Sequence, residues 1–128
     1  MGGDQAVIVA GIGCRRDCPA ADIVAAIRQA EAVSGHVVTA LAAPRFKAEE
    51  AGLSEATGLL SLSLTLVDDA ALTAVQPRCV TISATAERHT GFASVAEAAA
   101  LAAAGSEARL CLARIAVGGA TCALAEAP

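Results

Sequence analysis

Residues 6–13 read AVIVAGIG, an unbroken apolar run that ends in a pair of glycines. A strand that is apolar on both faces needs cover on both faces, which is typical of a parallel sheet with helices on either side. The run therefore predicts a buried strand at residues 6–11 of an α/β protein. Whatever follows this strand lies at its carboxyl end, where ligands bind in open α/β sheets.

The hydrophobic periodicity and the turn residues predict strand, helix, strand, helix and strand, followed by helices and a hairpin. The expected helices span 18–35, 51–60, 69–75 and 94–105, and the later strands span 36–43, 62–67, 108–117 and 120–127. Gly118 and Gly119 are expected to form the hairpin turn. This order indicates a single domain over 1–128. We expect a three-layer α/β/α sandwich with a mixed, mainly parallel sheet and a C-terminal antiparallel hairpin.

Charge and composition exclude several classes of partner. The net charge is −4, and Phe46 and Phe92 are the only aromatic residues. Nucleic-acid binding relies on a basic surface and, for single strands, on aromatic stacking, so it is not expected. No apolar run reaches the ~18 residues of a membrane span, and the N-terminus lacks the basic segment of a signal peptide. We therefore expect a cytoplasmic protein with no membrane partner.

The cysteines indicate neither a disulfide framework nor a metal site. There are five of them, an odd number, and their spacing is scattered. In a cytoplasmic protein such cysteines are expected to be thiols.

The segment GIGCRR at residues 11–16 places two arginines at the expected ligand-binding edge. It lacks the third glycine of the dinucleotide motif and the lysine of a P-loop, so no nucleotide cofactor is expected. Gly11 and Gly13 permit close approach of the backbone to a ligand. The guanidinium groups of Arg15 and Arg16 suit a carboxylate or a phosphate. The alternative is a solvated turn that carries two surface arginines.

Two further basic residues are candidates for the same site. Lys47 is the only lysine in the chain, and it follows the second predicted strand. Its compact ammonium group differs in chemistry from the guanidinium groups that the chain otherwise uses. Arg114 lies within an apolar strand, which favours a side chain directed toward a ligand. The alternatives are a lysine on a solvated loop and an edge-strand arginine that guards against aggregation.

Cys14 and Glu97 are the candidates for catalysis. Cys14 lies beside the arginines and near the start of a helix, a setting that lowers the pKa of a thiol. The alternative for Cys14 is a small buried residue. Ser94 and Glu97 match a capping box at the start of the helix at 94–105. Glu97 would act as a general base if its carboxylate faced the same edge of the sheet.

Three separate blocks of the sequence agree with one family. They are GIGCRR at 11–16, KAEEAGL at 47–53 and TGFASVAEAAALAAAG at 90–105. In this order they resemble the CobE family of cobalamin-biosynthesis proteins, which are similar to the C-terminal domain of CbiG. The family pattern is G-I-G-C-R-R, then D-L-K-x-x-E-x-G-L, then S-V-A-E-x-A-A-L. The resemblance covers nearly the whole chain, with departures at capping and loop positions such as Pro19 and Ala51.

The resemblance implies a role in cobalamin (vitamin B12) biosynthesis, whose precorrin intermediates are tetrapyrroles that carry many carboxylates. The expected binding residues are Gly11, Gly13, Arg15, Arg16, Lys47, Ser94 and Arg114. We expect a protein that binds such an intermediate and assists corrin ring formation. One alternative is a hydrolase that acts on the precorrin ring-A lactone through Glu97 or Cys14. Another is an α/β domain that binds a phosphorylated small molecule.

The partners that the resemblance implies are a precorrin-type tetrapyrrole and other corrin-biosynthesis enzymes. The alanine-rich helix at 93–104 would offer a surface for a homodimer if it were exposed.

Overall fold

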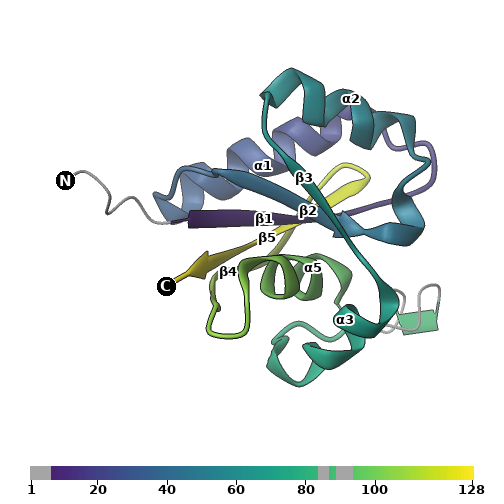
Figure 1. Ribbon diagram of the computed structural model, residues 1–128. Helices are drawn as coiled ribbons and strands as arrows, with labels where there is room; N and C mark the ends of the chain where they lie inside the picture. Colours follow the sequence, from purple (N-terminus) through teal and green to yellow (C-terminus); the bar gives the residue numbers. More distant parts are fainter. Residues whose placement is uncertain (1–6, 84–86, 89–93) are drawn as a thin grey trace.

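The computed structural model describes residues 7–83, 87–88 and 94–128. Its centre is a five-stranded sheet with the order β3-β2-β1-β5-β4 (Figure 1). The strands are β1 (Val7–Cys14), β2 (Ala40–Pro44), β3 (Leu64–Val67), β4 (Arg109–Val117) and β5 (Ala120–Ala127). The pairs β1–β2 and β2–β3 are parallel, and the pairs β1–β5 and β4–β5 are antiparallel. The predicted mixed sheet and C-terminal hairpin are therefore confirmed, with parallel and antiparallel pairings in equal number.

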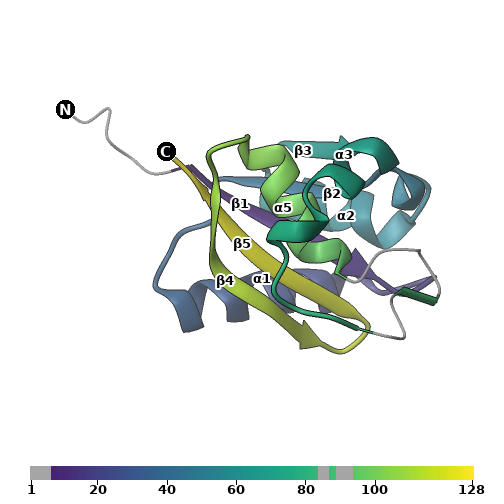
Figure 2. The ribbon, with the colours of Figure 1, turned by 90° about the horizontal axis from the view of Figure 1, so that it is seen from below.

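Helices cover both faces of this sheet. On one face lie α1 (Ala20–Ser34) and α2 (Ala51–Leu60), and on the other lie α3 (Asp69–Ala74) and α5 (Val95–Ala104) (Figures 1 and 2). The connections include two short 3₁₀ helices, η2 (Arg45–Lys47) after β2 and η3 (Gln76–Arg78) after α3. The arrangement is the predicted three-layer α/β/α sandwich.

The central strand β1 contributes to two cores, one on each face. Ile8 and Ile12 belong to the core beneath α1 and α2, whereas Val9 belongs to the core beneath α5. This alternation follows from the period of two in a strand. It explains why residues 8–13 are apolar throughout, since this part of the strand is buried on both faces.

The alanine-rich helix α5 lies directly on β1. A Cβ atom added to Gly11 would overlap the carbonyl oxygen of Ala96 and lie 2.6 Å from the amide nitrogen of Ala100. Gly11 therefore serves close helix–strand packing, and its expected role in ligand approach is wrong. Residues 96–101 of α5 are all buried. The expectation of an exposed dimerisation helix is wrong for the same reason.

The strands differ from their predicted bounds because pairing decides where a strand ends. β1 continues through Gly13 and Cys14, since β5 pairs with it as far as the Cys14–Ala120 position. β2 begins at Ala40, opposite Val9 of β1, rather than at residue 36. Residue 6 and the third-block residues 90–93 lie outside the described part of the chain.

The helices expected at 51–60 and 69–75 are confirmed as α2 and α3, and α3 ends one residue earlier than expected. The Asp68 carboxylate accepts a hydrogen bond from the amide of Ala71 (2.9 Å) at the start of α3. All five cysteines are free thiols, as the sequence predicted. None of the helices in the described part of the chain combines the length and the apolar character needed to cross a membrane.

Candidate functional site

One pocket of about 880 Å³ opens at the carboxyl ends of β1 and β2. Its charged lining residues are Arg15, Arg16, Lys47 and Arg114. We call this hollow the basic pocket. The sequence predicted that these four cations would share one edge of the sheet, and the structure does bring them to one hollow. Gly13 and Cys14 also line it, whereas Gly11 does not.

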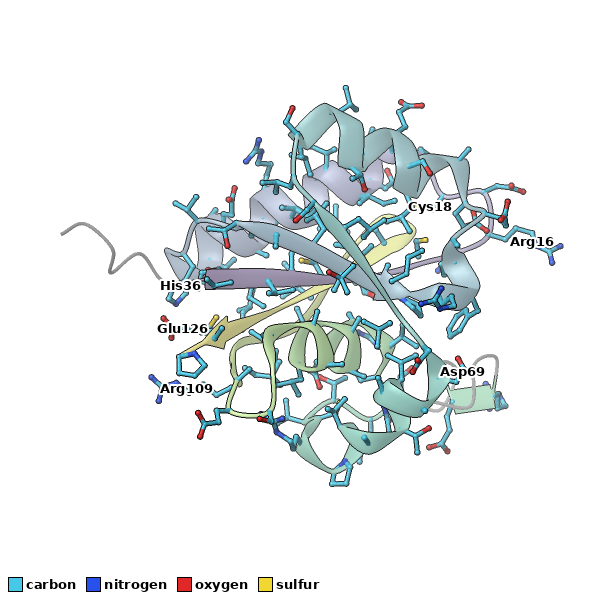
Figure 3. The ribbon with its side chains drawn as sticks, viewed as in Figure 1. Arg16, Cys18, His36, Asp69, Arg109 and Glu126 are labelled. Atoms are coloured by element: carbon cyan, nitrogen blue, oxygen red, sulfur yellow. The ribbon has the colours of Figure 1, made fainter. Side chains whose placement is uncertain are left out.

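Hydrogen bonds hold the turn that carries Arg15 and Arg16 on two sides. The amide of Arg15 donates to the carbonyl of Gly119 in the β4–β5 turn (3.0 Å). The amide of Asp17, whose φ is 60°, donates to the Glu50 carboxylate at the start of α2 (2.9 Å). Arg16 lies at this end of the sheet, with its side chain directed outward (Figure 3). The anchors are backbone groups, so the guanidinium groups remain available to a ligand.

The hairpin turn at the pocket is fixed by a carboxylate of α1. The Asp22 carboxylate accepts a hydrogen bond from the amide of Gly119 (3.0 Å). Gly118 has a φ of 59°, and a Cβ atom there would lie 2.5 Å from Asp22 Oδ2. Sequence reasoning missed both Asp22 and Glu50, because an acidic residue at a helix start ordinarily needs no further explanation. The only signal for Glu50 was its match to the second family block.

Arg114 lies beside an irregularity in the β4–β5 pairing. The register shifts between Leu112 and Ile115, so the ladder is interrupted there. A bulge of this kind redirects a side chain and leaves a backbone group outside the ladder. The amide of Arg114 donates to the carboxylate of Glu97 on α5 (2.9 Å). This contact connects the strand that carries Arg114 to the helix beneath it.

Glu97 is fully buried and accepts hydrogen bonds at both carboxylate oxygens. Oε1 accepts from the amides of Val80 (2.8 Å) and Thr81 (2.9 Å), and Oε2 accepts from the Thr81 hydroxyl (2.6 Å) and the Arg114 amide (2.9 Å). Burial raises the pKa of Glu97, but these hydrogen bonds outweigh it and leave the pKa below its ordinary value. Such a group is a poor proton acceptor at neutral pH.

The predicted capping box at Ser94 and Glu97 is wrong. Ser94 is the N-cap residue of α5, but its side chain makes no capping hydrogen bond, and the Glu97 carboxylate is occupied by Val80, Thr81 and Arg114. Within the described residues the buried Ser94 hydroxyl has no hydrogen-bond partner. Its place directly before Val95, which lines the basic pocket, leaves its role in binding a prediction.

Cys14 lines the basic pocket as a protonated thiol. Burial raises its pKa to about 11, and the charge of Lys47 offsets only part of this effect. The expectation of a lowered pKa at this position is therefore wrong. Its neighbours in the fold are largely apolar, since Cys14 packs against the core beneath α1.

The cations of the basic pocket form no ion pair with a carboxylate among the described residues. Among the described residues the ion pairs are Arg28–Glu31 on α1 and Arg109–Glu126, which is 4.0 Å long. Arg109 and Glu126 lie at the end of the sheet opposite Arg16 (Figure 3). The carboxylates of Asp22 and Glu50 lie at the pocket turns but bind backbone amides there, so the four cations stay free of ion pairs with described residues and suit an anionic ligand.

Comparison with known proteins gives consistent results. Residues 8–125 match the family described as Cobalamin synthesis G C-terminus. Among curated proteins, no sequence matches this chain significantly. The crystal structure of CobE, a protein from the cobalamin (vitamin B12) biosynthetic pathway, is similar with a TM-score of 0.88 and 38% identity, over 94% of this chain and 90% of that one.

Two further solved structures are similar. The cobalamin biosynthesis protein chiG from Agrobacterium tumefaciens str. C58 has a TM-score of 0.77 and 48% identity, over 93% of this chain and 97% of that one. A cobalamin biosynthesis protein G homolog from Sulfolobus solfataricus shares the fold, with a TM-score of 0.74 and 22% identity, over 96% of this chain and 37% of that longer one. The match over residues 8–125 and these likenesses confirm the resemblance seen in the sequence: the chain belongs to the family of the cobalamin synthesis G C-terminus.

Proposed function

We propose that this chain binds a tetrapyrrole intermediate of cobalamin synthesis through the carboxylates of that intermediate, and that it assists corrin ring formation. The observation that carries the proposal is the basic pocket, whose four cations form no ion pair with any other described residue. Uncompensated cations in a concave surface attract a polyanion. Membership of a cobalamin-synthesis family supports the choice of a carboxylated tetrapyrrole as this polyanion.

The size and the walls of the basic pocket support a large, partly apolar ligand. Its volume of about 880 Å³ lies toward the upper end of the range for small-molecule sites, roughly 300–1,000 Å³. Phe46, Val95 and Ala116 contribute apolar surface beside the cations. A macrocycle with carboxylates at its edge would place its ring against the apolar wall and its charges on the guanidinium and ammonium groups.

The chemistry of the candidate catalytic residues favours binding over hydrolysis. Cys14 has a pKa of about 11 and is therefore a thiol, not a nucleophilic thiolate, at neutral pH. Both carboxylate oxygens of Glu97 already accept hydrogen bonds from described residues of the protein. The alternative of a hydrolase that opens the ring-A lactone lacks an activated base or nucleophile among these two residues.

A titration with a carboxylated porphyrin tests the proposal. Uroporphyrin has carboxylates on every pyrrole ring, and coproporphyrin has the same macrocycle with fewer of them. We expect the absorption and fluorescence of uroporphyrin to change on binding, and coproporphyrin to bind more weakly. Arg114→Ala removes a charge-assisted contact worth about 1.5–3 kcal/mol, so we expect roughly ten- to hundredfold weaker binding.

Arg109→Ala is the matched control. Arg109 lies on the same strand as Arg114, at the opposite end, and its side chain is 84% exposed. We expect this variant to bind uroporphyrin like the wild type. Equal losses in the two variants, or no binding of either porphyrin to the wild type, would contradict the proposal. Competition by phosphate esters without any porphyrin binding would support the alternative of a phosphorylated small molecule.

A further inference from the structure

Glu97 lies at the meeting point of three parts of the chain. It is on the first turn of α5, it accepts hydrogen bonds from Val80 and Thr81 in the segment after η3, and it accepts one from Arg114 of β4. Two of these parts reach the basic pocket, because Ser83 and Arg114 line it. The Glu97 carboxylate thus connects two walls of the pocket, the segment after η3 that leads to Ser83 and the part of β4 that carries Arg114.

The donor set requires a carboxylate at this position. Two amides bond Oε1, and one amide and one hydroxyl bond Oε2, so both oxygens act only as acceptors. An ionised carboxylate offers acceptor sites on both oxygens and no donor. A glutamine would direct its NH₂ group toward Arg114 or toward the amides of Val80 and Thr81. At least one of these partly buried amides would then lose its acceptor inside the protein, which destabilises the contact.

We infer that Glu97 is a positioning residue of the basic pocket, which holds the backbone at Arg114 and at Val80–Thr81 so that both walls meet the ligand in one fixed geometry. This inference rests on the proposed function of the pocket. Arg114 lies at a break in the β4–β5 register, so its backbone lacks the support that a regular ladder would give. The bond to Glu97 supplies that support.

The first measurement needs no ligand. Amide hydrogen exchange by NMR reports on the hydrogen bonds of Thr81 and Arg114 in the folded protein. In Glu97→Gln we expect faster exchange at one or both of these amides, with the rest of the sheet unchanged. Glu107→Gln, the same substitution in the exposed turn after α5, should leave both amides protected.

The second measurement is a double-mutant cycle on uroporphyrin binding. If Glu97 acts by positioning Arg114, Glu97→Gln weakens binding about tenfold in the wild type and much less in the Arg114→Ala protein, because coupled residues are not additive. The same factor in both backgrounds, or wild-type affinity in Glu97→Gln, would overturn the inference. Failure of the wild type to bind uroporphyrin would instead overturn the proposed function, and the exchange data would still report whether Glu97 anchors the backbone.

Thr81 provides the test if Glu97→Gln does not fold. Thr81→Val removes the hydroxyl that donates to Oε2 (2.6 Å) and leaves the carboxylate in place. We expect this variant to bind uroporphyrin several-fold more weakly and Thr81→Ser to restore binding, because serine keeps the hydroxyl. Unchanged binding in Thr81→Val, or the same loss in Thr81→Ser, would overturn the inference for this wall of the pocket.

Discussion

A buried carboxylate without a cation beside it has to be stabilised by hydrogen bonds, because burial penalises its charge. Glu97 satisfies this requirement with donors from Val80, Thr81 and Arg114, which lie 16 or 17 residues away in the chain. The sequence predicted either a local partner, three residues away at Ser94, or a carboxylate that faces the edge of the sheet as a general base or as the partner of a cation there. A capping box and a long-range network use the same residue type at the same position, so local spacing does not distinguish them.

We expect acid to destabilise the wild-type protein more steeply than the Glu97→Gln variant. Burial raises the pKa of Glu97, but its hydrogen bonds lower it by more, so that the pKa in the folded state lies below its ordinary value. Glu97 therefore contributes its full stabilisation above the pKa of the unfolded chain and loses it as the pH falls through the lower native pKa. Urea unfolding at a series of pH values measures the difference.

Among the described residues, Cys79 is a titratable neighbour of Glu97, and burial raises its pKa to about 11, so it does not ionise in this range. Glu107→Gln serves as the control and should follow the wild type. If Glu97→Gln loses stability as steeply as the wild type when the pH falls, other groups determine the loss of stability in acid and the prediction is wrong.

At the scale of the elements, α5 packs directly against the backbone of β1 at Gly11. Gly11 has no side chain, and the backbone of α5 at Ala96 and Ala100 occupies the space that a Cβ atom would need. The alanine side chains at both contact positions, Ala96 and Ala100, allow this close approach. The sequence predicted that Gly11 lets a ligand approach the backbone, but in the fold Gly11 lets α5 pack against β1. This packing brings Val95, in the first turn of α5, to the basic pocket.

We expect Gly11→Ala to destabilise the protein by at least about 1–3 kcal/mol, the usual cost of overpacking, because the clash is with backbone that cannot move alone. Gly58→Ala is the control. Gly58 lies within α2 and has no neighbour within 4 Å of an added Cβ atom. It should stabilise the protein by about 0.5–1 kcal/mol, since alanine favours a helix. Urea unfolding measures the free energy of unfolding of both variants. An equal change in this free energy for Gly11→Ala and Gly58→Ala would refute the packing argument.

At the scale of the whole molecule, charge is distributed unevenly. The chain carries a net charge of −4, yet the cations of the basic pocket gather at one end of the sheet without carboxylate partners among the described residues. In a protein with a negative net charge, a local group of cations directs an anionic ligand to the pocket that they line. The same distribution predicts a marked effect of salt on binding.

We expect uroporphyrin binding to weaken progressively with salt, because the Debye length falls from about 10 Å at 0.1 M to about 3 Å at 1 M. Isothermal titration at several salt concentrations measures this slope. Arg114→Ala should bind with a shallower slope, since one of the charge pairs is absent, and Arg109→Ala should keep the wild-type slope. If the affinity depends on salt equally in all three proteins, Arg114 does not contribute to the salt effect and this prediction is wrong.

Local pattern alone determined much of this protein. The apolar run at 6–13, the helix at 51–60 and the Gly118-Gly119 turn identify the elements and the sandwich. The carboxyl ends of parallel strands meet at one edge, so the positions of Arg15 and Lys47 after two such strands already predicted a shared cationic site.

The tertiary structure decided how that site is held. The bond from Gly119 to Asp22 spans 97 residues, and the one from Asp17 to Glu50 spans 33. The strand bounds likewise depend on which partner a strand meets. The hydrophobic periodicity of a sequence predicts the face on which a side chain lies. A hydrogen bond between a backbone amide and a carboxylate far away in the chain forms only when the packing of the fold brings the two groups together. The local sequence around either group therefore does not predict such a bond.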